Sequence, residues 1–457
     1  MNLIVINGLK RYIIITKRDN KLKTSQDPNI CFMKYYTLIG MILLIVGCSP
    51  FINKHLKNFD IEIKKGEVAE KAGDYNEAIA HYSEALKVIP THPPTVYNIA
   101  RLNALSGNDE YAINYLMNSI SLGYGLAAVN DTAFVSLKDT IRFSKVLSKI
   151  DEMKKTIHKS ELGFTYDEKD LAPESVAYDP VEEAFYLGSL YKCKIVRIDK
   201  EGNATDFITE KQNGLRMVIG IKVDAERRVL WTCNAVGRGF PPGIEEKETG
   251  WTALFKFDLT TGKLINKYIL HEEGVMHQFN DLTITKSGDV YTTNYLEGAI
   301  YRVLNDKDEL ELFYKSEELI SPNGITFSDN ENTIFVSGWK TFLYKIDFNT
   351  RKLSLVEHPD SFSTYGIDGI YYYKNSLLAV QDGLMIIARY YLNEDGSEIE
   401  RREIIEANNP VLDVPTTGVL VDDQLYYVAN CPSFHFHEDG SLVPDELNDV
   451  TILKTKL

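Results

Sequence analysis

A repeated pattern of short strands constrains the fold of this chain more than any other feature. In the clearest copy, residues 321–339, a polar pair is followed by an apolar strand, a turn rich in Asp and Asn, and a second strand. Six such copies, 43 to 61 residues apart, place one equivalent residue before the first strand: Glu174, Ile219, Asn280, Asn323, Asp368 and Thr417. Strand-rich repeats of this length are typical of a β-propeller with one four-stranded blade per repeat. The sequence therefore predicts an all-β six-bladed β-propeller over residues 172–457.

Residues 58–157 have helical periodicity and predict an all-α N-terminal domain. Small residues recur there at a 34-residue step, from Gly73 to Gly107 and from Ala78 to Ala112. This pattern resembles two tetratricopeptide repeats, followed by a capping helix pair over residues 131–157. Such repeats present a groove for a protein or peptide partner, and a plain spacer is an equally open interpretation. The polar residues 158–171 are expected to be a linker.

The N-terminal residues predict targeting rather than folded structure. Residues 33–48 combine a charged start, a short apolar run and the ending Ile45-Val46-Gly47-Cys48, which resembles a bacterial lipoprotein signal with Cys48 as the lipidated residue. The apolar run, residues 35–46, is too short for a spanning helix, which needs about 20 apolar residues. The alternative is an uncleaved anchor helix in which Cys48 is incidental. Residues 1–32 are interpreted as a mis-assigned start. We expect a lipid-anchored protein of the cell envelope, in the outer membrane where the cell has one.

Composition limits the classes of partner. The formal net charge of −15, without a basic stripe, argues against nucleic-acid binding. Three cysteines remain beyond Cys48, which is too few for a disulfide framework.

The repeat alignment predicts a metal site on the propeller axis. Innermost strands line the central channel, and four of the six aligned positions carry hard oxygen atoms: Glu174, Asn280, Asn323 and Asp368. Two carboxylates crowded on one axis repel each other unless one is protonated or a cation lies between them. A single Asn-Gly or Asp-Gly pair is more typical of a turn, but a shared phase favours one divalent metal ion. Calcium suits these ligands best, and zinc, magnesium and manganese are the alternatives.

Four segments carry a family resemblance: PESVAYDP, FNDLTITKSGDVYTTN, SPNGITFSDNENTIFVS and GIDGIYYYKNSLLAV. They resemble the signature segments of the senescence marker protein/gluconolactonase (regucalcin-like) family, and the resemblance extends from about residue 171 to the C-terminus. It implies that Glu174, Asn323 and Asp368 bind the metal, with Asn280 beside the substrate. Two residues depart from the family pattern: Ser175 replaces a glycine, and Gln278 replaces an arginine that grips a sugar acid.

These observations predict a metal-dependent hydrolase of lactones or related cyclic esters, with Asp368 or His277 accepting the proton of the attacking water. A surface or turn histidine is the alternative for His277. The competing hypothesis is a non-catalytic scaffold, in which the propeller holds a structural ion and the helical domain binds protein partners at the membrane.

Overall fold

The computed structural model describes residues 54–237, 248–340, 342–432, 441–443 and 446–457. The predicted signal segment with Cys48, and residues 238–247 within the second blade, lie outside these residues. No helix in the described part of the chain is long and apolar enough to cross a membrane.

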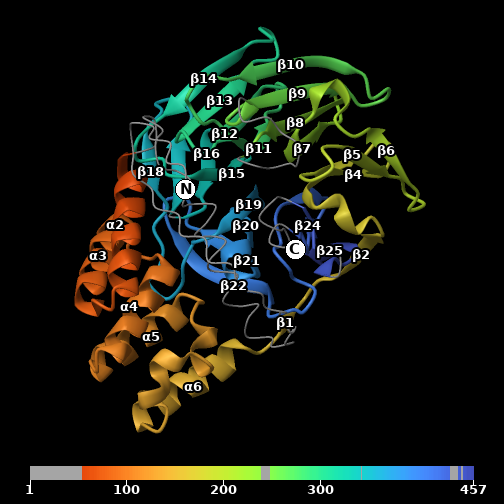
Figure 1. Cartoon of the computed structure of the whole chain (residues 1–457). Coiled ribbons are helices and arrows are strands. Elements are labelled where there is room, and N and C mark those ends of the chain that lie inside the picture. Colours follow the sequence, from red (N-terminus) through yellow and green to blue (C-terminus); the bar gives the residue numbers. More distant parts are fainter. Residues whose placement is uncertain (1–53, 238–247, 341, 433–440, 444–445) are drawn as a thin grey trace, which may run out of the picture. The chain divides into compact units, whose positions relative to one another are not determined.

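The described strands form six antiparallel sheets arranged as the blades of a propeller (Figure 1), which confirms the six-bladed prediction. Each of the first four blades is a run of four consecutive strands. Blade 1 consists of β3 (Pro173–Asp179), β4 (Ala184–Ser189), β5 (Ile195–Ile198) and β6 (Ala204–Ile208). Blade 2 consists of β7 (Met217–Asp224), β8 (Val229–Ala235), β9 (Thr252–Asp258) and β10 (Leu264–Leu270). Blade 3 consists of β11 (Phe279–Ile284), β12 (Val290–Asn294), β13 (Ala299–Val303) and β14 (Leu310–Lys315). Blade 4 consists of β15 (Pro322–Phe327), β16 (Thr333–Gly338), β17 (Leu343–Asp347) and β18 (Leu353–Leu355).

The last two blades recruit strands from the segment that was expected to be a linker. Blade 5 contains β19 (Ile367–Tyr372), β20 (Ser376–Gln381), β21 (Ile386–Leu392), β22 (Ile399–Ala407) and the short β1 (Ile157–His158) at its outer edge. Blade 6 contains β23 (Gly418–Val421), β24 (Gln424–Val428), β25 (Val450–Lys456) and β2 (Glu161–Tyr166). Residues 158–171 are therefore not a free linker. Their strand β2 pairs with the C-terminal β25 and joins the two ends of the ring.

The innermost strands of neighbouring blades approach so closely that some positions have no room for a side chain. A Cβ added to Gly324 would lie 2.4 Å from the backbone oxygen of Asp368 in the next blade. At Gly220 it would lie 2.6 Å from the backbone oxygen of Asn280. Real Cβ atoms do not come this close to a backbone atom, so glycine follows the aligned residue for a steric reason. The Asn-Gly pair of blade 4 lies at the start of a strand and is not a turn.

The helical segment consists of α2 (Lys54–Lys71), α3 (Tyr75–Val88), α4 (Pro93–Leu105), α5 (Asp109–Ser121) and α6 (Ile141–Met153), with the 3₁₀ helix η2 (Thr132–Leu137) before α6. Small residues act at the helix contacts as the sequence indicated. A Cβ at Gly66 would collide with the Tyr82 ring, so the glycine lets α2 and α3 pack closely. Between them, Gly73 turns the chain with φ +79°. The capping pair is one 3₁₀ helix and one α-helix, and the assignment as tetratricopeptide repeats stays a prediction.

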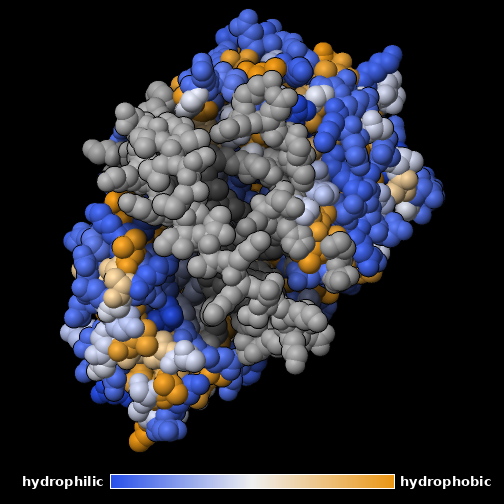
Figure 2. All heavy atoms as spheres, viewed as in Figure 1, coloured by the Kyte–Doolittle hydropathy of each residue, from blue (hydrophilic) through white to orange (hydrophobic). Residues whose placement is uncertain are grey.

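The face shown in Figure 2 is mostly hydrophilic over the described blades, with isolated hydrophobic side chains. Elsewhere in the described chain, Ile265 and Ile269 lie half exposed on the outer strand β10. Single exposed apolar side chains are normal for a globular surface.

Candidate functional site

The candidate site lies at the end of the channel where the innermost strands begin. In blades 1 to 5 the first residue of the innermost strand pairs with the last residue of the second strand, as Pro322 does with Gly338 and Ile367 with Gln381. Two chain positions per blade therefore face this end: the start of the innermost strand, and the residues just after the second strand. The sequence alignment identified only the first of these.

Glu174 and Asp368, the two aligned carboxyls, lie close enough for the charge of Glu174 to act on Asp368. Burial raises the pKa of Glu174 to about 8. Burial also raises the pKa of Asp368 well above its usual range, and the charge of Glu174 raises it further. Both shifts have the sign expected for acids that share a poorly solvated space. Without a cation, burial and mutual repulsion therefore favour the protonated forms of these acids.

A third acid at this end, Asp382, was missed by the sequence analysis. It begins the 3₁₀ helix η6 (Asp382–Leu384), directly after β20. Its Oδ1 accepts a hydrogen bond of 2.7 Å from Nε1 of Trp339, which follows β16 in blade 4. Burial raises the pKa of Asp382 to about 7, and its charge raises the pKa values of Glu174 and Asp368. Its signal in the sequence is an Asp-Gly pair after the second strand of a repeat, which resembles an ordinary turn.

Asn323, one of the aligned residues, binds to one of the acids. Its side chain is 4% exposed and donates a hydrogen bond to Asp368, which lowers the pKa of that acid. Its Oδ1 is buried and has no hydrogen-bond partner. Because a buried amide oxygen without a partner is unfavourable, this atom is an acceptor available to a cation or a ligand.

The other aligned positions play different parts. Asn280 is buried at the start of β11. Ile219 belongs to the apolar core of blades 2 and 3. Thr417 and its neighbour Thr416 donate their hydroxyl hydrogens to the backbone oxygen of Glu174, at 3.0 and 2.7 Å. These two bonds fix the start of β3 and thereby the level of the Glu174 side chain. Cys431 Sγ lies 4.0 Å from Glu174 Oε2.

A charged pair lies beside the acids in the channel. Lys222 Nζ is 3.5 Å from Oδ1 of Asp281 and 5.1 Å from the centre of the Tyr371 ring. The other oxygen of Asp281, Oδ2, is buried without a partner. The charge of Asp281 contributes to the raised pKa values of Glu174 and Asp368. The alignment missed Asp281 because it follows the aligned Asn280 by one residue.

His277, the second predicted proton acceptor, contacts side chains of blade 3. It is 1% exposed, and its Nδ1 lies 3.0 Å from Nδ2 of Asn294 and 3.4 Å from Oε2 of Glu297. Its Nε2 is buried without a hydrogen-bond partner. The alternative of a surface histidine does not fit this burial, and a catalytic role for His277 stays a prediction.

The donor set suits a hard divalent cation. No group of three or more His, Cys, Asp or Glu side chains in the described part of the chain is arranged to hold a metal ion. The predicted set has only two carboxyls and is completed by an amide. The unpartnered Oδ1 of Asn323 and the two acids that resist ionisation are the features that a cation would relieve. Glu174, Asn323 and Asp368 therefore fit the metal that the sequence predicts.

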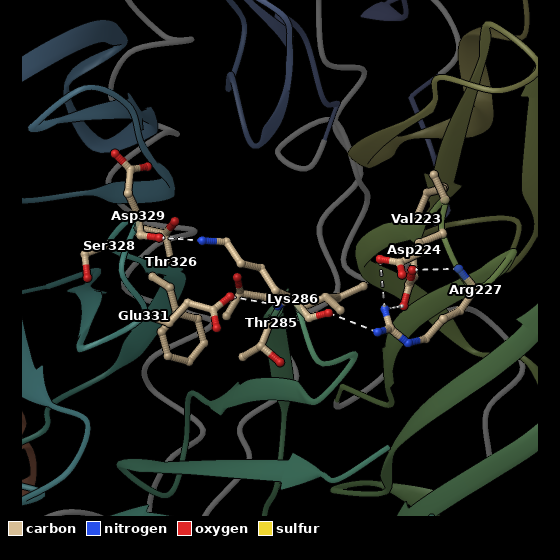
Figure 3. Close-up of a pocket in the computed structure, with 14 residues that line it drawn as sticks. Val223, Asp224, Arg227, Thr285, Lys286, Thr326, Ser328, Asp329 and Glu331 are labelled. Carbon is tan, nitrogen blue, oxygen red and sulfur yellow. Dashed lines mark hydrogen bonds and ion pairs between the residues drawn. The ribbon is translucent and has the colours of Figure 1, made fainter. Parts of the chain in front are cut away.

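A cavity of about 720 Å³ lies at the other end of the innermost strands (Figure 3), formed by the turns that follow β7, β11 and β15. Its charged groups bind one another: Arg227 contacts Asp224 at 3.1 Å, and Lys286 Nζ donates to the backbone oxygen of Asp329 at 2.7 Å. The backbone N–H of Lys286 donates to Glu331 at 2.7 Å. Because these groups already have partners, the cavity offers less to a polar ligand than the acid-lined end does.

Two of the comparisons with known proteins gave no match: no protein-family model fits the chain, and no curated protein matches it. Solved structures similar to it include a gluconolactonase from Xanthomonas campestris, at 13% identity, covering 66% of this chain and 98% of that chain with a TM-score of 0.46. A luciferin-regenerating enzyme gives 12% identity, 66% and 96% coverage and a TM-score of 0.46. An aldose sugar dehydrogenase from Streptomyces coelicolor, in its PQQ-bound form, is 12% identical, covers 66% of this chain and 98% of its own, and has a TM-score of 0.45. At such low identities and TM-scores, the candidate function has to be argued from the residues of the site.

Proposed function

We propose that this protein is a metal-dependent hydrolase of lactones or related cyclic esters, acting at the acid-lined end of the propeller channel. One observation carries the proposal: Glu174, Asn323 and Asp368 come from three different blades, and the Asn323 oxygen is buried there without a partner. Hard oxygen ligands of this kind suit calcium best, with magnesium, zinc and manganese as alternatives.

Each group has a distinct task in the proposed reaction. Glu174, Asn323 and Asp368 hold the cation, which when bound polarises the ester carbonyl and stabilises negative charge on its oxygen. Asp368 accepts the proton of the attacking water, a role that needs the acid in its ionised form. Asn280, buried at the start of β11, orients the substrate through its amide. Gln278 can donate a hydrogen bond but carries no charge, so the proposal favours neutral lactones over those bearing a carboxylate.

Activity of the loaded protein tests this function. Protein from Ser49 onward would be assayed on aldonolactones, acyl lactones and aryl esters, with calcium, magnesium, zinc or manganese and with a chelator. Asn323→Ala removes the amide ligand and is expected to lower kcat/KM at least 100-fold, whereas Asn305→Ala, an exposed amide after β13, leaves it unchanged. If no metal supports hydrolysis of any substrate, or if Asn323→Ala equals wild type, the proposed activity is wrong.

We also propose that the enzyme lies in the cell envelope, where a lipid on Cys48 anchors it. Its support is the sequence of residues 33–48, and the expected test is metabolic labelling with a lipid precursor. Cys48→Ala should abolish both labelling and signal cleavage, while Cys193→Ala, a buried thiol of the propeller, should preserve both. Cleaved wild-type protein that carries no lipid label would contradict the anchor.

A further inference from the structure

The helices contact the propeller at the same end as the candidate site. Lys340, directly after Trp339, is 2% exposed, and its Nζ lies 3.4 Å from Oδ1 of Asp60 in α2. Ser363, just before β19, donates to the backbone oxygen of Thr91 at 3.2 Å. These propeller residues belong to the segments that flank the starts of the innermost strands in blades 4 and 5.

Aromatic rings continue this contact towards the site. His92, which precedes α4, packs edge-on against Tyr365 with ring centres 4.9 Å apart. Tyr365 in turn packs against Trp339 at 5.4 Å. Burial lowers the pKa of His92 to about 3, and the charge of Lys340 contributes, so this histidine is neutral at physiological pH. The contact therefore includes stacked rings beside the buried Lys340–Asp60 ion pair.

Apolar groups complete the contact next to η6. Ile320, just before β15, joins Phe59 and Ile89 of the helical segment in one buried cluster. Leu384, two residues after Asp382, packs so close to Gly123 that a Cβ there would lie 3.3 Å from its Cδ1. The helical segment therefore contacts η6, the segment that presents Asp382, through Gly123 and Leu384.

The consecutive residues Trp339 and Lys340 link the two parts of the molecule. The Trp339 indole donates to Asp382 in the site, and the Lys340 ammonium pairs with Asp60 of α2. We propose that the helical domain holds Asp382 in the candidate site through this dipeptide, which makes Asp60 and Lys340 positioning residues. The helical domain would then be a structural part of the site and not only a spacer or a peptide binder.

The physical reason is the burial of the Lys340 charge. A buried ammonium that loses its carboxylate must find water, change its protonation or move. Because residue 339 is its immediate neighbour, such a movement shifts the indole that holds Asp382. Asp60 thus acts on Asp382 through two side chains and one peptide bond, without touching it.

Hydrogen exchange tests the inference without any need for activity. In the metal-free full chain, the reporter is the segment around Gly383, whose N–H donates to the Gly366 backbone oxygen at 3.3 Å. Asp60→Asn and Lys340→Met are each expected to raise its exchange rate at least tenfold. Arg228→Met is the control, because it breaks the 2.7 Å ion pair with Asp179 at the far end of β3. The control should lower the melting temperature and leave exchange around Gly383 unchanged.

Cation affinity supplies a second readout, which rests on the proposed function. Calorimetric titration with calcium, well below all melting temperatures, should show at least fivefold weaker binding in Asp60→Asn and unchanged binding in Arg228→Met. Exchange around Gly383 that is unaltered in Asp60→Asn, or raised equally by Arg228→Met, overturns the inference. If wild type binds no calcium, magnesium, zinc or manganese, the proposed function fails while the exchange comparison still decides this inference. Should Lys340→Met not fold, Asp60→Asn alone gives the answer.

Discussion

Replacing Asp368 by Asn tests the axial site because it removes a charge and almost preserves shape. Burial and the neighbouring acids raise the pKa of Asp368, so its ionisation near pH 8 opposes folding of the metal-free protein. Asp368→Asn removes this opposition, so the metal-free variant is expected to melt at a higher temperature than metal-free wild type at pH 8.

Adding a cation should reverse the order of the two melting temperatures, so that wild type melts above Asp368→Asn. Wild type with metal at 100 times its Kd gains about 2.7 kcal/mol, or about 4–5 °C. Asp368→Asn loses one of the two anionic ligands, so its metal-induced shift is expected to be below about 1 °C. Scanning calorimetry at pH 8, with chelator and with calcium, measures both differences.

Thr417→Val is the matched control for this pair of melts. It lies at the same level of the channel and removes only a hydroxyl that donates to the backbone oxygen of Glu174, while Thr416 keeps its own 2.7 Å bond to that oxygen and so preserves the position of Glu174. Its metal-induced shift should therefore equal that of wild type. Equal shifts in wild type and Asp368→Asn would refute the reasoning, because Asp368 would then have no part in binding a cation.

Two further predictions concern Glu174 and Gly324. The pKa of Glu174 is about 8 in the folded protein and near 4.5 in the unfolded chain. The contribution of this group to the stability of metal-free wild type is therefore full below pH 4.5 and is lost as the pH rises to 8. Glu174→Gln should flatten that part of the pH profile of the unfolding free energy in urea, and an unchanged slope would contradict the assignment. Gly324→Ala places a Cβ 2.4 Å from the Asp368 backbone oxygen and should lower the free energy of unfolding by about 3 kcal/mol or more. Gly274→Ala, which has open space around it and φ +77°, should lower it by about 1 kcal/mol. Equal losses in chemical denaturation would show that strand spacing is not the cause.

The sequence predicted the blades well because strand and turn signals recur in phase. Every blade begins its innermost strand within two residues of the aligned position, as Asn323 and Asp368 show. The same phase brought Glu174, Asn323 and Asp368 together, since equivalent positions of a propeller converge on its axis. Local patterns and symmetry were sufficient to bring these three side chains near one another, while their role as metal ligands stays a prediction.

The remaining features depend on contacts between distant segments. Strand β2 has a partner that follows it by most of the propeller, so nothing in residues 158–171 distinguishes it from a polar linker. Asp382 reaches the site only because β20 runs antiparallel to β19 and ends where β19 begins. The Lys340–Asp60 pair joins an α-helix to a propeller segment, and the sequence gives no sign of which helix that is.

The pairing of β2 with β25 also determines how the protein folds and unfolds in time. Glu161 faces Lys454 across this sheet, so this contact joins segments almost the whole propeller apart. Contacts between segments so far apart form slowly, and until this one forms β25 presents an unpaired edge to other chains. Opening the ring at this point means breaking the pairing of β2 with β25. Folding of this molecule is therefore expected to pass through an aggregation-prone open ring, whereas the finished ring should persist mainly because it opens slowly.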